Sequence, residues 1–328
     1  MRSRIIGTGS YVPERLVTNE ELSRLLRLDA EAIFRRTGIR TRHWAEDDQC
    51  TSHLAEMAAR RACESAGVIL SSADAIVVST TSPDMVFPST ACHLQNRLGV
   101  KGAASFDLAA SCSGFLYGLS MGDRLIRSGH VGRCLVVAAE IKSRSLNVHD
   151  EATAILFGDG AGAALLEAHT GAPHARGIWD VRLYADGTRH TLIRIPAGGS
   201  RQPVSRQTLE NRLHTLTMQG GPLFRVAIKR LAAAVLNLLK EFGLHVEDLS
   251  QTIFHQANGR MLAALGRRLG LSPEKMYSVI ELFGNTSSAS LPIALDHAVR
   301  NGRIKTGDLV LLGTFGGGLT WATGLVRW

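Results

Sequence analysis

The chain has 328 residues, and 37 Lys and Arg against 29 Asp and Glu give it a formal net charge of +8. Its length allows one large domain or two fused ones, and 45% hydrophobic with 20% charged residues is the composition of a globular rather than a disordered protein. Aromatic residues make up only 5%, and neither a Lys/Arg block nor a recognition-helix pattern occurs, so we expect no nucleic-acid partner. The positive charge is either dispersed over the surface or faces an anionic membrane surface or an acidic protein.

The first residues and the cysteines indicate the compartment. Met1–Ser10 has only two consecutive apolar residues, where a secretory signal needs roughly seven or more, and no segment reaches the roughly 18 apolar residues of a membrane span. The cysteines are odd in number, widely spaced and without a C-x-x-C pair, which predicts neither a disulfide framework nor a zinc site. They are Cys50, Cys63, Cys92, Cys112 and Cys134. We expect a cytoplasmic protein with no membrane insertion and no metal.

Helical periodicity alternates with short apolar, β-branched runs along the chain, which is typical of an α/β protein. In chain order, the pattern predicts a helix at Cys50–Ala66, a strand at Ala75–Ser79, a helix at Ser113–Ser128, a strand at Leu135–Ala139, a helix at Leu223–Phe242, a strand at Thr252–Phe254, a helix at Gly259–Leu269 and a strand at Leu309–Leu312. Several of these helices end at a glycine suited to a C-cap: Gly67, Gly129, Gly243 and Gly270. Ile195–Asn211 is a candidate for a mobile insertion.

Two parts of the chain resemble each other weakly, which indicates an internal duplication. Leu94–Val100 parallels Leu265–Leu271, and Ile126–Val131 parallels Val299–Ile304. Superposing the second pair places Cys112 opposite Asn285, and both are expected to begin a helix. We therefore predict two halves, residues 1–172 and 173–328, with ligands binding where the carboxyl ends of their strands meet.

Cys112 is the candidate nucleophile because a turn of small residues places it at the start of a predicted helix. The helix dipole at that position is expected to lower the pKa of the thiol and favour the reactive thiolate. Gly114, Gly118 and Gly122 follow at a spacing of four, which predicts a smooth ridge and a buried helix. The other four cysteines are expected to be buried and structural.

His255 directly follows a predicted strand, so it is expected to project into the crevice where Cys112 lies. With Asn285 it completes a Cys, His, Asn set. Gly316–Gly318 follows the last predicted strand and either presents backbone N–H groups to an oxyanion or forms a tight hairpin. Gly158–Gly162 lacks the Lys-Ser/Thr of a phosphate-binding loop and is interpreted as a packing turn.

These motifs closely resemble the β-ketoacyl-[acyl carrier protein] synthase III family over the whole chain. The matching segments are Arg36–Arg40, Leu108–Phe115, Phe157–Gly162, His255–Asn258, Gly284–Ser290 and Phe315–Trp321. The resemblance implies a thiolase-like fold, in which two duplicated halves form a layered α-β-α-β-α core. It also implies an acyltransferase of fatty-acid biosynthesis, active as a homodimer and without a metal or redox cofactor.

The resemblance further implies a two-step Claisen condensation. Cys112 attacks an acyl thioester, and the N–H groups of Cys112 and Gly317 hold the negative oxygen of the intermediate. Malonyl-acyl carrier protein then loses CO2, and His255 and Asn285 donate hydrogen bonds to the enolate that attacks the acyl-cysteine. The implied substrate-binding residues are Arg36, Phe87 and Phe315. A basic face for the acidic carrier protein is predicted on two helices and comprises Arg225, Lys229, Arg260, Arg267 and Arg268.

Two positions depart from the family pattern where coenzyme A is usually held. Ala32 stands in place of a tryptophan that stacks on the adenine, and Glu151 stands in place of an arginine. Both changes should weaken coenzyme A binding. Three hypotheses follow: a synthase III that uses acyl-coenzyme A, a specialised relative that uses an acyl-carrier donor or another acceptor, and a non-catalytic dimer partner, against which the intact Cys, His, Asn set argues.

Overall fold

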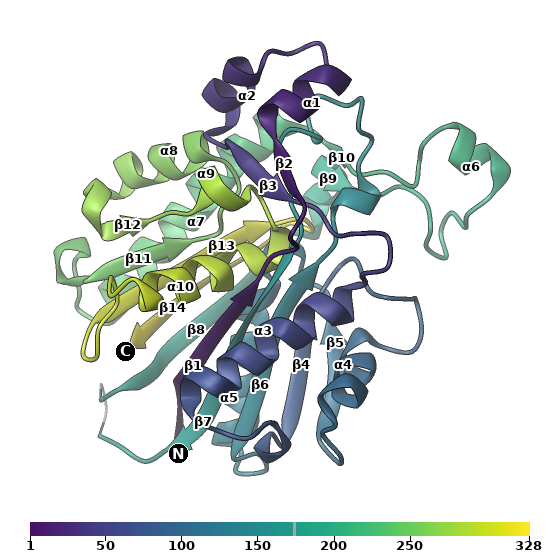
Figure 1. The fold of residues 1–328 in the computed structure, drawn as a ribbon. Helices are drawn as coiled ribbons and strands as arrows, with labels where there is room; N and C mark the ends of the chain where they lie inside the picture. The colour runs from purple at the N-terminus through teal and green to yellow at the C-terminus, as the bar shows by residue number, and fades with distance from the viewer. Residues whose placement is uncertain (173–174) are drawn as a thin grey trace.

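The computed structural model describes residues 1–172 and 175–328 and contains two five-stranded sheets (Figure 1). The first sheet has the order β1-β7-β6-β4-β5, and the second, read in the same sense, has the order β8-β14-β13-β11-β12. The first sheet comprises β1 (Arg2–Tyr11), β7 (Gly160–His169), β6 (Arg133–Glu140), β4 (Ala75–Ser79) and β5 (Ala104–Leu108). The second comprises β8 (Gly177–Ala185), β14 (Thr320–Arg327), β13 (Leu309–Gly316), β11 (Gln251–Phe254) and β12 (Met276–Tyr277).

Helices cover both sheets and fill the space between them, as Figure 1 shows. The outer layers are α3 (Thr51–Ala66) with α4 (Thr90–Leu98), and α7 (Gly220–Glu241) with α8 (Gly259–Leu269); the middle layer is α5 (Gly114–Arg127) with α10 (Ser290–Arg300). Side chains of β4 alternate between layers: Ile76 and Val78 pack in the cluster with α3 and α4, and Val77 packs in the cluster with α5 and α10. The predicted α-β-α-β-α fold is confirmed.

All eight elements predicted from periodicity are present, with ends that differ by up to four residues. The structure adds the sheet strands β1, β5, β7, β8, β12 and β14 and the helices α4 and α10, which were not among those eight. The shorter elements are β2 (Leu16–Thr18), α1 (Asn19–Leu25), α2 (Ala30–Thr37), β3 (Thr41–His43), β9 (Ile193–Arg194), α6 (Arg206–Glu210), β10 (Thr217–Met218) and α9 (Ile280–Phe283). Within the described ranges, no helix is long and apolar enough to cross a membrane.

The internal duplication extends to side chains. Asp123 and Arg127 form an ion pair near the end of α5, and Asp296 and Arg300 form the equivalent pair in α10. Both aspartates are buried and accept hydrogen bonds from hydroxyl groups of β1. The two helices therefore correspond in register over their C-terminal turns.

The predicted match of Cys112 with Asn285 is wrong because α5 has 14 residues and α10 has 11. An alignment of α5 with α10 that is based on their C-terminal ends therefore does not align their N-terminal ends. Each helix is preceded by a 3-10 turn, Ser111–Ser113 or Ser287–Ala289, whose first serine has a φ of +49° or +53°. Matched on these turns, Cys112 corresponds to Ser288, and Asn285 precedes its turn.

The predicted boundary between halves falls at residues 172 and 173, and residues 173–174 lie outside the described part of the chain. Strands of the first sheet all precede it, and strands of the second all follow it. The middle core nevertheless contains residues of both halves. The division of the chain into halves at this boundary therefore stays a prediction.

The segment predicted as a mobile insertion forms an arm that carries α6 and projects from the body of the molecule (Figure 1). Its base is held by Ala197 N–H donating to Leu213 O at 2.9 Å and by Leu216 N–H donating to Ser145 O at 2.7 Å. Ile193 and Met218, on the β9-β10 ribbon below the arm, line the pocket described next. The mobility of the arm stays a prediction.

Candidate active site

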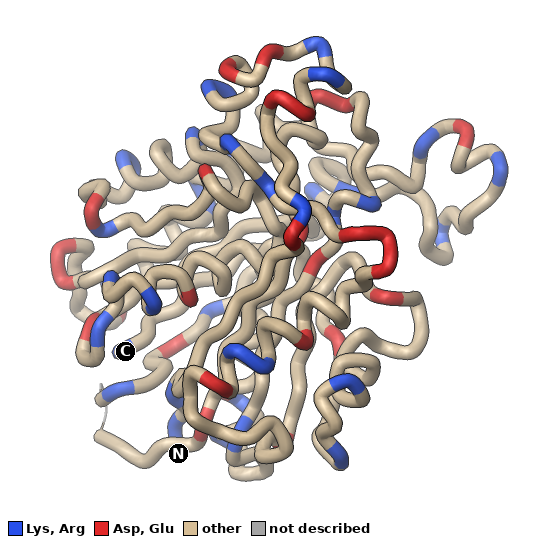
Figure 2. Tube along the Cα trace, viewed as in Figure 1, with Lys and Arg blue, Asp and Glu red and all other residues tan. Residues whose placement is uncertain are grey.

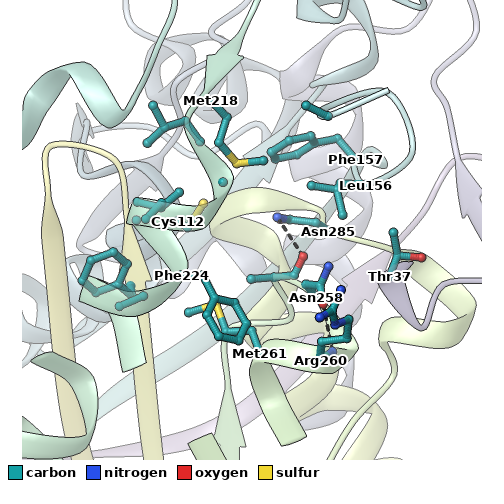
Figure 3. Close-up of a pocket in the computed structure, with 18 of the residues that line it drawn as sticks. Thr37, Cys112, Leu156, Phe157, Met218, Phe224, Asn258, Arg260, Met261 and Asn285 are labelled. Carbon is teal, nitrogen blue, oxygen red and sulfur yellow. Dashed lines mark hydrogen bonds between the residues drawn. The ribbon is translucent and has the colours of Figure 1, made fainter. Parts of the chain in front are cut away.

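Cys112 lies in the 3-10 turn that leads into α5, and its side chain is only 5% exposed. Ser111, directly before it, has a φ of +49°, a conformation that residues other than glycine rarely adopt. This sharp turn connects the end of the first sheet to the middle helix layer. It directs the sulfur toward a pocket lined by residues of both halves of the chain, where Figure 3 shows it.

The glycine ridge of α5 brings the helix against the first sheet, as predicted. A Cβ atom at Gly114 would lie 1.7 Å from Ser79 Oγ, one at Gly118 would lie 2.8 Å from Val136, and one at Gly122 would lie 2.9 Å from Leu166. No side chain fits at these distances without displacing the sheet. The nucleophile therefore begins a helix whose position is fixed by close packing.

Burial raises the pKa of the Cys112 thiol, which corrects the lowering predicted from the helix dipole alone. The cause is desolvation, because a thiolate in this enclosed position loses most of its water. A contact opposes it: Ser287 Oγ lies 3.5 Å from the sulfur. This contact offsets only part of the desolvation, so the surroundings on balance favour the neutral thiol.

The remaining cysteines carry free thiols that lie outside the pocket. Burial raises the pKa of Cys63 to about 11 and that of Cys134 to about 12, so both are inert structural residues. The prediction of burial is wrong for Cys92, which is exposed on α4, and for Cys50, which is half-buried at the start of α3. Both lie at or near helix N-termini, where the first turn is open to solvent.

His255 follows β11 directly and is 6% exposed. Its backbone N–H donates to Gly313 O at 2.8 Å, which extends the pairing of β11 with β13 by one residue. Its Nδ1 lies 2.5 Å from Ser290 Oγ, and that oxygen also accepts the N–H of Gln256 at 3.1 Å. Burial lowers the pKa of the imidazole to about 3, so the ring is neutral at physiological pH.

Asn285 is 5% exposed, and its amide orientation is set by two backbone groups. Ser287 N–H donates to Oδ1 at 2.9 Å, and Nδ2 donates to Ala257 O at 3.4 Å. Since Oδ1 is occupied, the amide presents Nδ2 as a donor toward the pocket, where Figure 3 shows it beside Cys112.

Gly316–Gly318 forms the turn of the hairpin between β13 and β14, so the hairpin alternative holds, and it also contacts the nucleophile. A Cβ at Gly316 would lie 2.7 Å from Cys112 N. Thr320 Oγ1 donates to Ala110 O at 2.8 Å, and Ser113 Oγ donates to Thr320 O at 3.0 Å. These two hydrogen bonds connect the hairpin to the turn that contains Cys112. Gly317 lines the pocket beside them.

The other glycine-rich segment, Gly158–Gly162, packs closely as predicted, but it is not a turn throughout, because Gly160–Gly162 forms the start of β7. A Cβ at Gly162 would lie 2.7 Å from Pro292 of α10. The Asp159 carboxylate is buried and accepts hydrogen bonds from the Ala45 N–H and from Ser143. The segment thus joins the first sheet to the middle helices, and none of its residues lines the pocket that contains Cys112.

One pocket of about 510 Å³ brings the predicted chemical residues together. Cys112, His255, Asn285, Phe315 and Gly317 all line it, and Figure 3 shows the apolar side chains of Leu156, Phe157 and Met218 near Cys112 and Asn285. The apolar wall includes Ile155, Leu156, Phe157, Met218, Leu223 and Phe224. Phe87 is absent from this lining; it is 86% exposed on the loop before α4.

Arg36 also lines the pocket, at its mouth, and the structure pairs it with Glu151 at 3.2 Å. Both side chains are partly exposed, so the pair adds little to stability. The pair matters because Glu151 binds Arg36, the cation that the resemblance assigns to substrate binding. Ala32 lies on the same helix and does not line the pocket.

The five predicted docking residues all lie on α7 and α8, which pack together, and all are exposed. Arg225 and Arg260 also line the pocket mouth. No ion pair involves any of the five in the described ranges. Figure 2 shows that charged residues lie mainly on helices and loops, with few on the central strands.

Several residues in contact with the site were missed in the sequence: Glu140, Lys142, Ser287 and Ser290. Glu140 ends the apolar run of β6 with 0% exposure, and a carboxylate in that position was the one available signal. Over residues 1–172 and 175–328, no group of three or more His, Cys, Asp or Glu is arranged to hold a metal ion.

The duplicated five-layer fold and the Cys, His, Asn pocket define a class of protein, the thiolase-fold condensing enzymes. Known sequences and structures resolve the family within it. The family model described as "3-Oxoacyl-[acyl-carrier-protein (ACP)] synthase III" matches residues 106–187. The model of the C-terminal part of the same family matches residues 239–328. A β-ketoacyl-[acyl-carrier-protein] synthase III of Alkalilimnicola ehrlichii is 46% identical over 327 residues, which cover 99% of both chains.

Solved structures agree. The 3-oxoacyl-(acyl carrier protein) synthase III of Pseudomonas aeruginosa superposes with a TM-score of 0.91 at 36% identity, covering 100% of this chain and 98% of that one. The priming β-ketosynthase of a polyketide biosynthetic pathway superposes with a TM-score of 0.90 at 35% identity, covering 99% and 95%. The chain belongs to the β-ketoacyl-[acyl-carrier-protein] synthase III family, whose members are acyltransferases.

Proposed function

We propose that the protein catalyses a decarboxylating Claisen condensation of an acyl thioester with malonyl-acyl carrier protein and so starts fatty-acid chains. The observation that carries this function is the pocket that brings Cys112, His255 and Asn285 together within the family's fold. The reaction needs no metal or redox cofactor, because hydrogen-bond donors alone can stabilise the charge that develops on oxygen.

In the first step the Cys112 sulfur attacks the acyl carbonyl, an S–C bond forms, and the carrier thiol leaves. The negative oxygen of the intermediate needs donors, and backbone N–H groups of Cys112 and Gly317 are assigned to it. The contact of the glycine turn with Cys112 supports this assignment. Phe315 and the apolar wall provide the surface for the acyl chain.

In the second step the malonyl group loses CO2, and the enolate carbon attacks the acyl-cysteine. Two donors on the enolate oxygen are required, and a neutral His255 and the Nδ2 of Asn285 are both suited to the role. A positively charged imidazole is not needed. Since one such donor typically contributes roughly 3 to 4 kcal/mol, both are required for a useful rate.

The carrier protein is assigned to the face of α7 and α8 that carries Arg225, Lys229, Arg260, Arg267 and Arg268, because acidic carriers associate with unpaired cations. A homodimer is proposed as well. Phe87 is exposed and does not line the pocket of its own chain, so we assign its contact with an acyl chain to the pocket of a second copy. The cytoplasmic location remains a prediction.

A second candidate is a specialised condensing enzyme whose acyl donor is carried by a protein rather than by coenzyme A. The Arg36–Glu151 pair favours it, because a carboxylate at the pocket mouth repels nucleotide phosphates and occupies the arginine. Acylation of Cys112 by one acyl group should then be faster from the carrier, and Ala32→Trp with Glu151→Arg should raise the rate from coenzyme A. A wild type that prefers coenzyme A, with no gain from the double change, would remove this candidate.

The main test is intact-protein mass spectrometry after exposure to acyl-coenzyme A and acyl-carrier thioesters. We expect one acyl adduct, lost in Cys112→Ala and kept in Cys92→Ala, which removes a more exposed thiol. Cys112→Ala should fold normally and form no condensation product. An adduct that persists in Cys112→Ala would refute the assignment.

A further inference from the structure

The buried surface behind Cys112, on the side away from the substrate, holds an ion pair that the proposed reaction does not use. Glu140, at the end of β6, is 0% exposed, and Lys142 Nζ lies 3.0 Å from its Oε2. Lys142 is also buried and donates to Thr81 Oγ1 at 2.6 Å. Buried ion pairs contribute little to stability on balance, so their presence beside a nucleophile invites a functional reason.

Ser287 connects this pair to two of the proposed catalytic residues. Its Oγ lies 3.5 Å from Cys112 Sγ and 3.2 Å from Glu140 Oε1, and its N–H donates to Asn285 Oδ1. Its φ of +53° is a conformation that serine rarely adopts and that the surroundings must enforce. One strained residue thus contacts the nucleophile, the enolate donor and the buried carboxylate.

The hydrogen-bond count around Ser287 shows what its hydroxyl can do. A serine hydroxyl has one hydrogen, and an ionised carboxylate only accepts, so Ser287 donates to Glu140 while the thiol S–H donates to Ser287 Oγ. Glu140 has other donors: Thr81 N–H, Ser82 Oγ, Ser288 Oγ and Lys142 Nζ. The Ser287 hydrogen can therefore turn from the carboxylate to a thiolate without leaving Glu140 unpaired.

We propose that the Glu140–Lys142 pair and Ser287 are positioning residues for Cys112: the pair orients the Ser287 hydroxyl, and that hydroxyl turns to the sulfur whenever a thiolate is present. This occurs twice in a cycle, when the thiol loses its proton to attack the acyl donor and when the thiolate leaves the acyl group after condensation. The inference rests on the proposed role of Cys112 as nucleophile. The thiol proton leaves with the departing carrier thiol, and solvent supplies the proton that restores Cys112.

The charges of the pair act on the thiol in opposite directions. The Glu140 carboxylate raises the pKa of Cys112, and the Lys142 ammonium and the Ser287 hydrogen bond lower it. His255, across the pocket, is neutral and adds no charge. Because the two charges oppose each other, removing one should shift the thiol and removing both should restore it.

The test is the pH profile of Cys112 alkylation by iodoacetamide, measured by intact mass, together with the rate of acylation. Ser287→Ala should lower alkylation at neutral pH about tenfold and move the profile up by about one pH unit, since a hydrogen bond to a charged group is lost. Ser288→Ala is the matched control, because Ser288 donates to the same oxygen, Glu140 Oε1, at 2.9 Å but does not contact the sulfur. It should leave the profile within a few tenths of a unit.

Variants that remove one charge of the pair should shift the alkylation profile in opposite directions, which a merely structural role of the pair would not do. Glu140→Gln should move the alkylation profile to lower pH and Lys142→Met to higher pH, and the neutral double variant should return it near the wild type. Should either single variant fail to fold, Ser287→Ala against Ser288→Ala still decides. Equal profiles for the two serine variants would overturn the proposal.

The alkylation profile also separates this inference from the proposed function. It reports the Cys112 thiol whether or not an acyl donor is bound. If Cys112 formed no acyl adduct, the proposed function would fail while the alkylation shifts could stand. If the adduct formed and Ser287→Ala shifted nothing, only the positioning role would fail. Malonyl decarboxylation should persist in Ser287→Ala, because the backbone N–H that holds Asn285 remains.

Discussion

The proton on the His255 imidazole is placed by Ser290. Ser290 Oγ already accepts the Gln256 N–H, so its own hydrogen is available for Nδ1, 2.5 Å away. The neutral ring then carries its proton on Nε2, the nitrogen that Ser290 does not contact. Only this tautomer can donate a hydrogen bond from Nε2 to an enolate. The short contact between Ser290 Oγ and Nδ1 selects it.

We therefore predict that Ser290→Ala lowers malonyl decarboxylation about tenfold while Cys112 is acylated at the wild-type rate. Without the hydroxyl, the ring samples both tautomers and loses its fixed orientation. Release of CO2 from malonyl-carrier protein measures the effect, and Ser288→Ala, a buried serine that does not contact His255, is the control. Equal losses in both variants would point to a packing defect.

The same histidine predicts a flat pH dependence. Its pKa is lowered to about 3, so the imidazole charges only as the pH falls toward that value. Decarboxylation by the wild type should show no titration of this group between pH 5 and 8. A loss of activity with a midpoint near 6.5 would mean that the ring is solvated in the working enzyme.

At the scale of elements, α5 shows how far sequence reasoning reaches. The spacing of Gly114, Gly118 and Gly122 was enough to predict a closely packed helix, because a missing side chain is visible in sequence. The lengths of α5 and α10 were not predictable from a repeat, since α5 has three more residues than α10 between its 3-10 turn and its C-terminal end. For this reason the correspondence of Cys112 with Asn285 failed although the repeat itself was real.

The ridge makes a stability prediction. Gly118→Ala would place a Cβ 2.8 Å from Val136 and should reduce the free energy of unfolding by about 1 to 3 kcal/mol, as overpacking does. Denaturant unfolding measures this loss, and acylation of Cys112 should slow as α5 shifts. Gly187→Ala, which meets no atom within 4 Å, is the control and should be neutral. Equal stability of the two variants would show that the sheet yields easily.

At the scale of the whole molecule, the sequence identified the residues of the site but not the pairs they form. Cys112, His255 and Asn285 meet in one pocket, because motifs at strand ends and helix starts converge in this topology. The pairing of Arg36 with Glu151 and of Glu140 with Lys142 joins segments whose approach no local pattern encodes. These ion pairs could therefore be identified only from the structure.

Arg225, Lys229, Arg260, Arg267 and Arg268 on α7 and α8 form no ion pair within the described ranges, so their charge is available to an acidic partner. Arg260→Glu should raise the KM for malonyl-carrier protein several-fold with little change in kcat, and the effect should shrink as salt rises. Lys101→Glu makes the same charge change on an exposed loop beyond α4 and is the control. If both variants changed KM equally, general attraction rather than docking would explain the result.

The last prediction concerns a second copy of the chain. In the described part of the chain β5 pairs on one side only, and the loop before α4 exposes Val86 at 96% and Phe87 at 86%. An open strand edge and adjacent exposed apolar side chains are features that association covers. We expect the wild type to sediment as a dimer and the double variant Val86→Ser, Phe87→Ser to dissociate at least partly. Ile69→Ser, at an equally apolar position that is 74% exposed after α3, should leave the dimer intact. A monomeric wild type would contradict the dimer and also remove Phe87 from the acyl site, because that side chain does not line the pocket of its own chain.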